Sequence, residues 1–305
     1  MGFDKQGAVS VFELVIYFPA IIVAAIVCSR HGFGRSSGWI YTLILCLVRI
    51  IGACCQLATY ANKTSTGLIE AVVILDSVGM SPLLLATLGL LSRCADTINS
   101  TKGSTFSAIH FRLLQLLITI GLILCIVGGT SSTSSDGTYH VQSETKIGEI
   151  LYVVALAALY IVAFITKSKM HNAPSSDNRL AWAVIIALPL ITVRLLYSLI
   201  SVFTHDKHFS LLTGSVIIHV FMAVLEEMVV VVIYLAFGWA TPVLAAEARG
   251  PIANRPWKGN LSPAGQAQHG NGHGRGRRQG PIHQLVGAGI AAAQSRSQPR
   301  QQQGV

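Results

Sequence analysis

Six of the ionisable side chains that stand inside long apolar runs of the sequence could do chemistry there, where side chains that meet hydrocarbon are expected. They are Arg49, Asp76, Arg194, His219, Glu226 and Glu227. The two glutamates are adjacent in the run "IIHVFMAVLEEMVVVVIYLAFGW". An ionised side chain at the middle of a membrane helix costs about 2.5–3.5 kcal/mol. We therefore expect these side chains to face protein, water or a countercharge.

Two arginines and three carboxylates at a similar depth predict a buried ionic and hydrogen-bonded cluster. Adjacent residues on a helix differ by about 100°, so Glu226 and Glu227 cannot point the same way. His219 precedes Glu226 by seven residues and lies on its face. We expect Glu226, His219 and one arginine to face a shared interior. Three roles remain open for the cluster: a static lock between helices, a pathway for a solute or a proton, and a conformational switch.

Other chemistry finds little support in the sequence. The last apolar run has no lysine for a retinal Schiff base, and the histidines are too few and too scattered for haem or catalytic zinc. Intramembrane prenyl proteases carry an arginine four residues after a glutamate pair, and Val231 occupies that position. No phosphate loop and no nucleophile arrangement with histidine and aspartate is present. We expect no enzyme activity, no cofactor and no metal.

The elements that must position these residues are membrane helices. The chain has 305 residues, of which 52% are hydrophobic and 11% charged, against about 25% charged residues in a soluble domain. A span needs roughly 20 apolar residues. Seven segments qualify, at about 8–29, 38–60, 67–91, 108–128, 147–166, 180–203 and 214–238. The predicted fold class is an all-α, polytopic bundle of seven transmembrane helices.

Three prolines fall inside the predicted spans. Pro19, Pro82 and Pro189 belong to the first, third and sixth span. Each lacks the N–H that would bond the carbonyl four residues earlier. For Pro82 that carbonyl is at Val78, two residues from Asp76. Kinked helices beside buried charge suit a ligand cavity or a moving gate, and they also occur in inert membrane helices.

Loop charges predict the orientation. Fifteen lysines and arginines flank the spans on one side, eight of them in the tail, against four on the other side. The positive-inside rule then places the amino terminus outside and the carboxyl terminus in the cytoplasm. We predict a transmembrane domain over 1–240 and a disordered, basic cytoplasmic tail over 241–305, rich in Gly, Gln, Pro, His and Arg. The tail could contact anionic lipid or a cytoplasmic protein, and no nucleic acid is expected.

The run "RHGFGRSSGWIYTLILCLVRIIGACCQLATY", residues 30–60, resembles an uncharacterised family of fungal seven-helix membrane proteins. The likeness extends over roughly residues 1–245 and stops before the tail. It implies a fungal, multi-pass membrane protein and transfers no catalytic or ligand residue, because none is established for that family. The Asp-Arg-Tyr and Asn-Pro motifs of the large animal receptor class are absent.

These observations favour a receptor-like or sensor protein in the plasma membrane or another membrane of the secretory system. The alternative is a proton-linked transporter or lipid translocator that uses the charge cluster as its pathway. Many transporters contain two related halves, and seven spans do not divide in that way. A scaffold whose charges only hold the helices together is the third reading.

Overall fold

The computed structural model describes residues 5–31, 38–61, 66–102, 106–130, 142–169, 175–204, 216–243 and 252. These residues are almost entirely helical, and no strand occurs among them. The helices are α1 (Lys5–His31), α2 (Trp39–Ala61), α3 (Thr66–Val78), α4 (Met80–Lys102), α5 (Ala108–Thr130), α6 (Ser143–Lys169), α7 (Ser175–Phe203), α8 (Val216–His219), the π-helical turn η3 (Val220–Val224) and α9 (Leu225–Ala240). Most of the predicted tail lies outside the described residues.

Seven helices are long and apolar enough to cross a membrane. They lie at Gln6–His31, Trp39–Tyr60, Gly67–Ser100, Ala108–Thr130, Ser143–Lys169, Asp177–Phe203 and Val216–Ala240. Each predicted segment overlaps one of them, which confirms the all-α, multi-pass fold class. The third helix continues about nine residues beyond the predicted 67–91, because polar residues at its end are buried in contacts with other helices.

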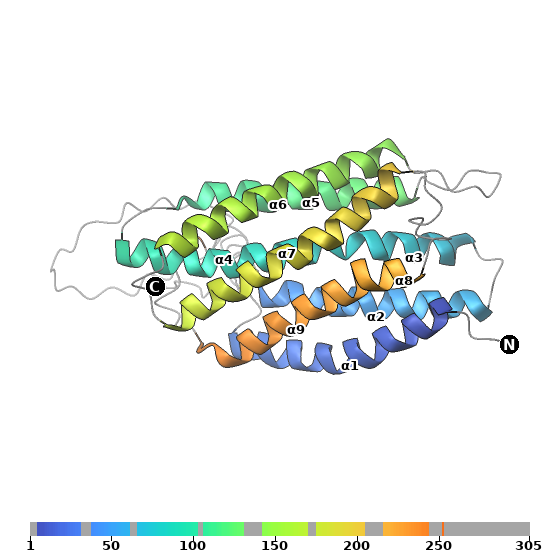
Figure 1. Ribbon diagram of the computed structural model, residues 1–305, viewed down its shortest axis with the longest axis horizontal. Helices are drawn as coiled ribbons and strands as arrows, with labels where there is room; N and C mark the ends of the chain where they lie inside the picture. Colours follow the sequence, from blue (N-terminus) through green and yellow to red (C-terminus); the bar gives the residue numbers. More distant parts are fainter. Residues whose placement is uncertain are drawn as a thin grey trace, which may run out of the picture. The chain divides into compact units, whose positions relative to one another are not determined.

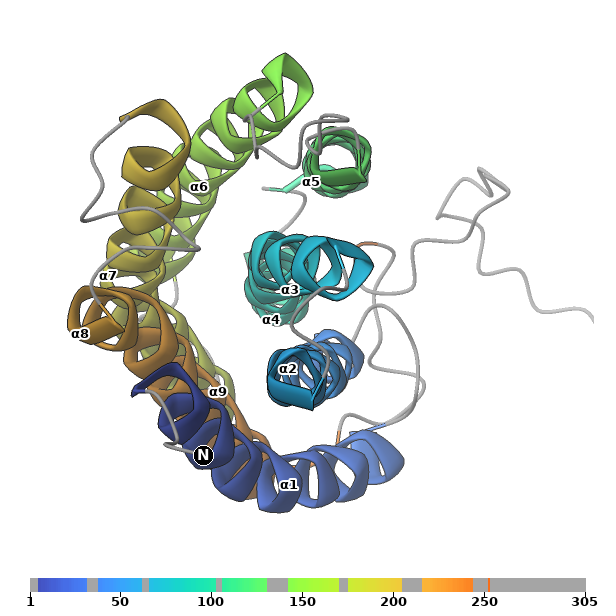
Figure 2. The ribbon, with the colours of Figure 1, turned by 90° about the vertical axis from the view of Figure 1, so that its right-hand side faces the viewer.

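The helices belong to one compact unit, Met1–Lys258. Within it, α2, the α3–α4 pair and α5 form an inner row, and α1, α9, α7 and α6 curve around that row (Figures 1 and 2). Helix α4 packs against α2, α5, α6 and α7, and its residues 80–96 are buried throughout. The bundle exposes apolar side chains such as Val15 and Ile22 of α1, Leu113 of α5 and Phe164 of α6, as a surface in contact with lipid requires.

Glycines allow the closest helix contacts. A Cβ on Gly128 of α5 would overlap Thr145 of α6, and one on Gly148 would meet Sγ of Cys125 at 2.6 Å. Gly238 of α9 accepts the ring of Trp39, whose atoms lie 2.8–2.9 Å from the position of an added Cβ. Small residues of this kind let membrane helices approach closely and gain dispersion energy without a hydrophobic driving force.

Two spans are irregular where they pass the charged residues. The third span breaks at Gly79, between α3 and α4, so Pro82 falls in the first turn of α4, where its missing N–H is tolerated. The seventh span contains the π-helical turn η3, which separates α8 from α9. In contrast, α1 and α7 continue through Pro19 and Pro189. Both irregularities lie within a few residues of the predicted cluster.

Candidate functional site

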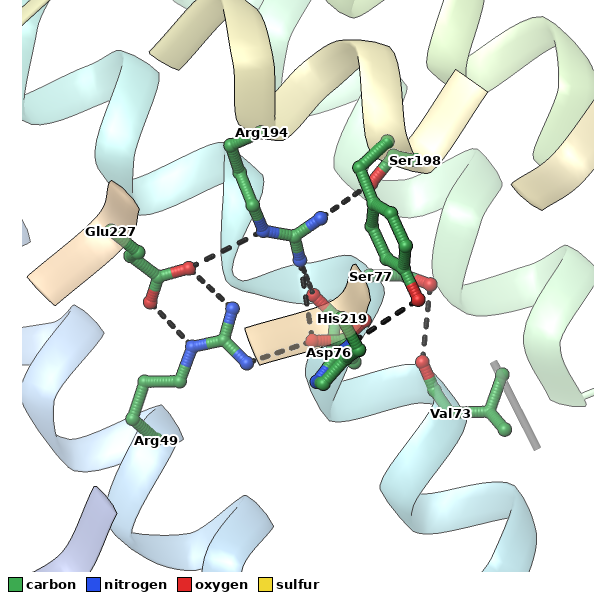
Figure 3. A network of polar contacts seen from close by, with 9 residues as sticks. Arg49, Val73, Asp76, Ser77, Arg194, Ser198, His219 and Glu227 are labelled. Atoms are coloured by element: carbon green, nitrogen blue, oxygen red, sulfur yellow. Dashed lines mark hydrogen bonds and ion pairs between the residues drawn. The ribbon is translucent and has the colours of Figure 1, made fainter. Parts of the chain in front are cut away.

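Four of the six predicted residues form one buried network between α2, α3, α7 and α9 (Figure 3). Arg49 donates from Nε and Nη2 to both carboxylate oxygens of Glu227, and from Nη1 to Oδ1 of Asp76 at 2.8 Å. Glu227 is fully buried, and Arg49 is 7% exposed. A guanidinium that binds one carboxylate with two parallel bonds fixes both distance and angle. The network therefore ties these helices together with defined geometry.

Arg194 closes the network from α7. Its Nη2 donates to Oδ1 of Asp76 at 3.2 Å and to the main-chain oxygen of Asp76 at 3.0 Å. Its Nη1 donates to the hydroxyl of Ser198 at 2.7 Å, and its Nε lies 3.6 Å from Oε2 of Glu227. Asp76 stands near the end of α3, just before the break at Gly79. The arginine thus binds both the side chain and the main chain of a helix end.

The break also makes room for Arg49. A Cβ on Gly79 would lie 3.0 Å from Nη2 of Arg49, closer than nearly all real contacts of that kind. Glycine at this position lets the guanidinium reach both Asp76 and Glu227. The third span is therefore interrupted at the position where the guanidinium of Arg49 needs the space.

The expected shared face of Glu226 and His219 is not found: Glu227 joins the network instead. In a regular helix, residues seven apart share a face, which predicts Glu226 opposite His219. A π-helical turn contains one extra residue, so residues beyond it lag by about 100°. The turn at Val220–Val224 therefore places Glu227 where Glu226 was expected. Glu226 is half-buried, and its Oε2 has no hydrogen-bond partner.

A cavity opens beside the network, at the end of the bundle where α1 and α8 begin and α2 ends. Its volume is about 90 Å³, which gives room for roughly six to nine waters. Arg49 and Asp76 belong to its wall, and the other polar side chains that line it are Gln6, Ser10, Glu13, Gln56, Tyr197 and His219. The Nδ1 of His219 shares a hydrogen bond of 3.1 Å with the hydroxyl of Tyr197. His219 therefore belongs to the site as a residue of the cavity wall, and it does not share a helix face with Glu226.

Sequence reasoning missed two buried carboxylates on either side of the network. Glu13 of α1 is 8% exposed and lines the cavity. Glu149 of α6 is 1% exposed, its Oε2 has no hydrogen-bond partner, and it interacts electrostatically with Arg194 and Asp76. Both stand near the start of their apolar runs, where a charge is commonly assigned to the membrane surface. Their position inside an otherwise apolar helix was the available signal.

A second polar cluster ties the opposite end of the bundle. Arg93 of α4 donates to Oδ1 of Asp177 at 3.3 Å and to the main-chain oxygen of Pro242 at 3.1 Å. The main-chain N–H of Ile252 donates to Oδ1 of Asp96 at 3.0 Å, and Ile252 is fully buried. Pro242 and Ile252, which follow the seventh span, are thus bonded to α4. The third span therefore carries polar ties to other helices at Asp76 of α3 and again at the carboxyl end of α4.

The arrangement combines a small polar cavity with a network that shares two of its wall residues. Among the described residues, no group of three or more histidines, cysteines or acids has the geometry of a metal site. A family model described as a domain of unknown function, DUF7702, matches residues 3–244, which include all seven spans. No curated protein and no solved structure matches the chain.

Proposed function

The chain belongs to the DUF7702 family, whose function is unknown, and we propose that it is a receptor-like sensor in a membrane. In this proposal a small polar ligand enters the cavity and alters the network of Arg49, Asp76, Arg194 and Glu227. The amino terminus, and with it the cavity, faces outside, and the tail faces the cytoplasm. The loop charges support that orientation, and the resemblance noted above supports a fungal, multi-pass membrane protein.

One observation carries the proposal: Arg49 and Asp76 line the cavity and also belong to the network. A ligand that contacts either residue changes the ties between α2, α3, α7 and α9. A ligand shifts a conformational equilibrium only through contacts that differ between the two states. Here those contacts and the interhelical ties involve the same atoms. The irregular turns at Gly79 and Val220–Val224 give two of these helices a place to bend.

A binding role is also favoured over catalysis. The network carboxylates are held by arginines, and both oxygens of Glu227 accept hydrogen bonds from Arg49. A carboxylate so engaged is poorly placed to act as a general base. Glu13 and Glu149, which stand on either side of the network, favour the alternative of a proton-linked transporter, since intramembrane carboxylates serve as proton relays.

Flux measurements separate sensor from transporter. The purified full chain is reconstituted into liposomes that contain a pH-sensitive dye, and an imposed proton gradient is followed. A sensor leaves the rate of gradient decay equal to that of empty liposomes. The sensor would be refuted if the gradient decayed faster with the wild type than in empty liposomes, more slowly with Glu227→Gln, and as fast as the wild type with Glu226→Gln. That set of results would establish a pathway through the network.

Substitutions that fill the cavity distinguish a sensor, which binds a ligand there, from a scaffold, which does not. Gly52 lines the cavity, and a Cβ there meets only Leu75, at 3.6 Å, so the Cβ of Gly52→Leu fits without a clash and the rest of its side chain reduces the space. Ile51→Phe adds similar bulk on the lipid-facing side, where Ile51 is 44% exposed. If the protein is a sensor, we expect a compound in a thermal-shift screen to bind it. We expect Gly52→Leu to weaken that binding and Ile51→Phe to leave it unchanged. Binding that ignores both changes would place the ligand elsewhere.

A further inference from the structure

Glu13 is a carboxylate in the cavity wall without an ion pair among the described residues, because Arg49, which interacts with it electrostatically, forms its ion pairs with Asp76 and Glu227. It makes no hydrogen bond and no ion pair with the residues that the structure describes, whereas Asp76 receives hydrogen bonds from Arg49 and Arg194. Two arginines balance Asp76 and Glu227 in the network. With His219 counted as neutral, the wall and the network together keep one formal negative charge, at Glu13. Intramembrane carboxylates are normally paired.

An anionic ligand fits this wall poorly. Arg49 already uses its Nε, Nη1 and Nη2 for Glu227 and Asp76, and Arg194 is fully buried outside the cavity wall. A ligand carboxylate or phosphate would have to break these bonds and would also face Glu13. The ligand that complements this wall is a cation, because it supplies the positive charge that would pair with Glu13.

We propose that the cavity binds a small primary amine in its ammonium form, with Glu13 as the countercharge. This assignment rests on the proposed function, since it names the ligand class of the same cavity. Gln6, Ser10 and Glu13 are spaced by four and three residues, so they share one face of α1. The hydroxyl of Ser10 donates to the main-chain oxygen of Gln6 at 3.2 Å, which leaves its own oxygen free to accept.

The wall favours an ammonium with N–H groups over a quaternary one. An ammonium has three donors, and the carboxylate of Glu13 and the side-chain oxygens of Ser10 and Gln56 line the cavity as acceptors. Quaternary ammonium ions instead prefer several aromatic faces. The aromatic rings in this wall are those of Tyr197 and His219, which bond each other. A volume of about 90 Å³ suits a ligand of roughly six to nine non-hydrogen atoms.

Matched compounds and variants test this assignment. Aminobutanol, butanediol and hydroxybutyrate share one carbon chain and differ in charge; choline adds a quaternary ammonium. Each is titrated against the purified full chain at neutral pH while the melting temperature is recorded. Glu13→Gln removes the countercharge, Glu13→Asp keeps it, and Glu70→Gln changes a half-buried carboxylate of α3 outside the cavity wall.

We expect aminobutanol to raise the melting temperature of the wild type and of Glu70→Gln more than the other three compounds do. Loss of a hydrogen bond to a charged group corresponds to a fall in affinity of roughly ten- to hundredfold, which is the expected effect of Glu13→Gln. Glu13→Asp should retain part of the affinity. Glu13→Gln should fold, because it removes an unpaired buried charge.

Three results would overturn the assignment. Equal stabilisation of the wild type and Glu13→Gln by aminobutanol excludes Glu13 as the countercharge. Stabilisation by butanediol or hydroxybutyrate in place of aminobutanol excludes the ammonium class but leaves the cavity as a ligand site and the sensor intact. No stabilisation by any of the four compounds also rejects the ammonium. Conversely, Glu13-dependent binding combined with proton flux would reject the sensor alone.

Discussion

Replacing Glu227 with glutamine should strongly destabilise the bundle, whereas the same change at Glu226 should not. Glu227 is fully buried, accepts two hydrogen bonds from Arg49 and lies 3.6 Å from Nε of Arg194. Without its charge, two buried arginines share the single carboxylate of Asp76. Removing one partner of a buried ion pair costs about 3–5 kcal/mol. Glu226 takes no part in the network, so Glu226→Gln should change stability by about 0.5 kcal/mol or less.

The two variants are compared by heating the purified proteins in one detergent and following tryptophan fluorescence. In a domain of this size, 1 kcal/mol corresponds to a shift of about 2–4 °C. Glu227→Gln should therefore melt about 6–20 °C below the wild type, and Glu226→Gln close to it. Adding Arg49→Gln to Glu227→Gln should cost less than the sum of the single changes, because the second substitution removes an uncompensated charge.

The refuting outcome concerns the register of the seventh span. If Glu226→Gln lowered the melting temperature as much as Glu227→Gln, or more, the π-helical turn would not place Glu227 on the arginines. If neither change mattered, the network would hold the helices less tightly than its geometry indicates. Size-exclusion profiles of both variants before heating show whether each starts from the folded state.

Three further predictions concern other parts of the bundle. Gly128→Val should lower the free energy of unfolding by about 1–3 kcal/mol, because the new side chain overpacks against Thr145. Gly52→Ala should be tolerated, because its Cβ has its nearest contact at 3.6 Å. The melting temperatures of the two variants are compared, and equal values would count against close packing of α5 on α6. Asp177→Asn should weaken the bond from Arg93 and speed hydrogen exchange at the joined ends of α4 and α7, and unchanged exchange would show that the contact contributes little. In intact cells, an epitope at the amino terminus should be accessible to antibody and one at the carboxyl terminus protected; the reverse pattern would overturn the proposed orientation.

The spans and most of the network could be predicted from the sequence because both depend on depth in the membrane. A segment that crosses hydrocarbon needs about 20 apolar residues, so hydropathy located all seven helices. Arg49, Asp76 and Arg194 lie near the middle of their apolar runs, and charges at one depth in a small bundle must find one another. The structure brings these three residues together with Glu227.

The sequence does not predict which side of the seventh span each glutamate side chain faces. Nothing in "VFMAV" distinguishes a π-helical turn from an α-helical one, and that turn decides which of two adjacent glutamates faces inward. Glu149 was missed for a different reason. Helix α6 begins at Ser143, four residues before the predicted span, so Glu149 lies one turn deeper than its apolar run indicates.

The glutamate pair gives the seventh span two alternative alignments with the arginines. If the extra residue of the π-helical turn were absorbed and the segment became a regular helix, Glu226 would take the rotational position of Glu227 relative to His219. A carboxylate would then face Arg49 in either alignment. Rotation of the helix would exchange one ion pair for an equivalent one and would leave no arginine charge stranded in hydrocarbon. Adjacent identical residues therefore reduce the difference in free energy between the two alignments of the helix about its own axis.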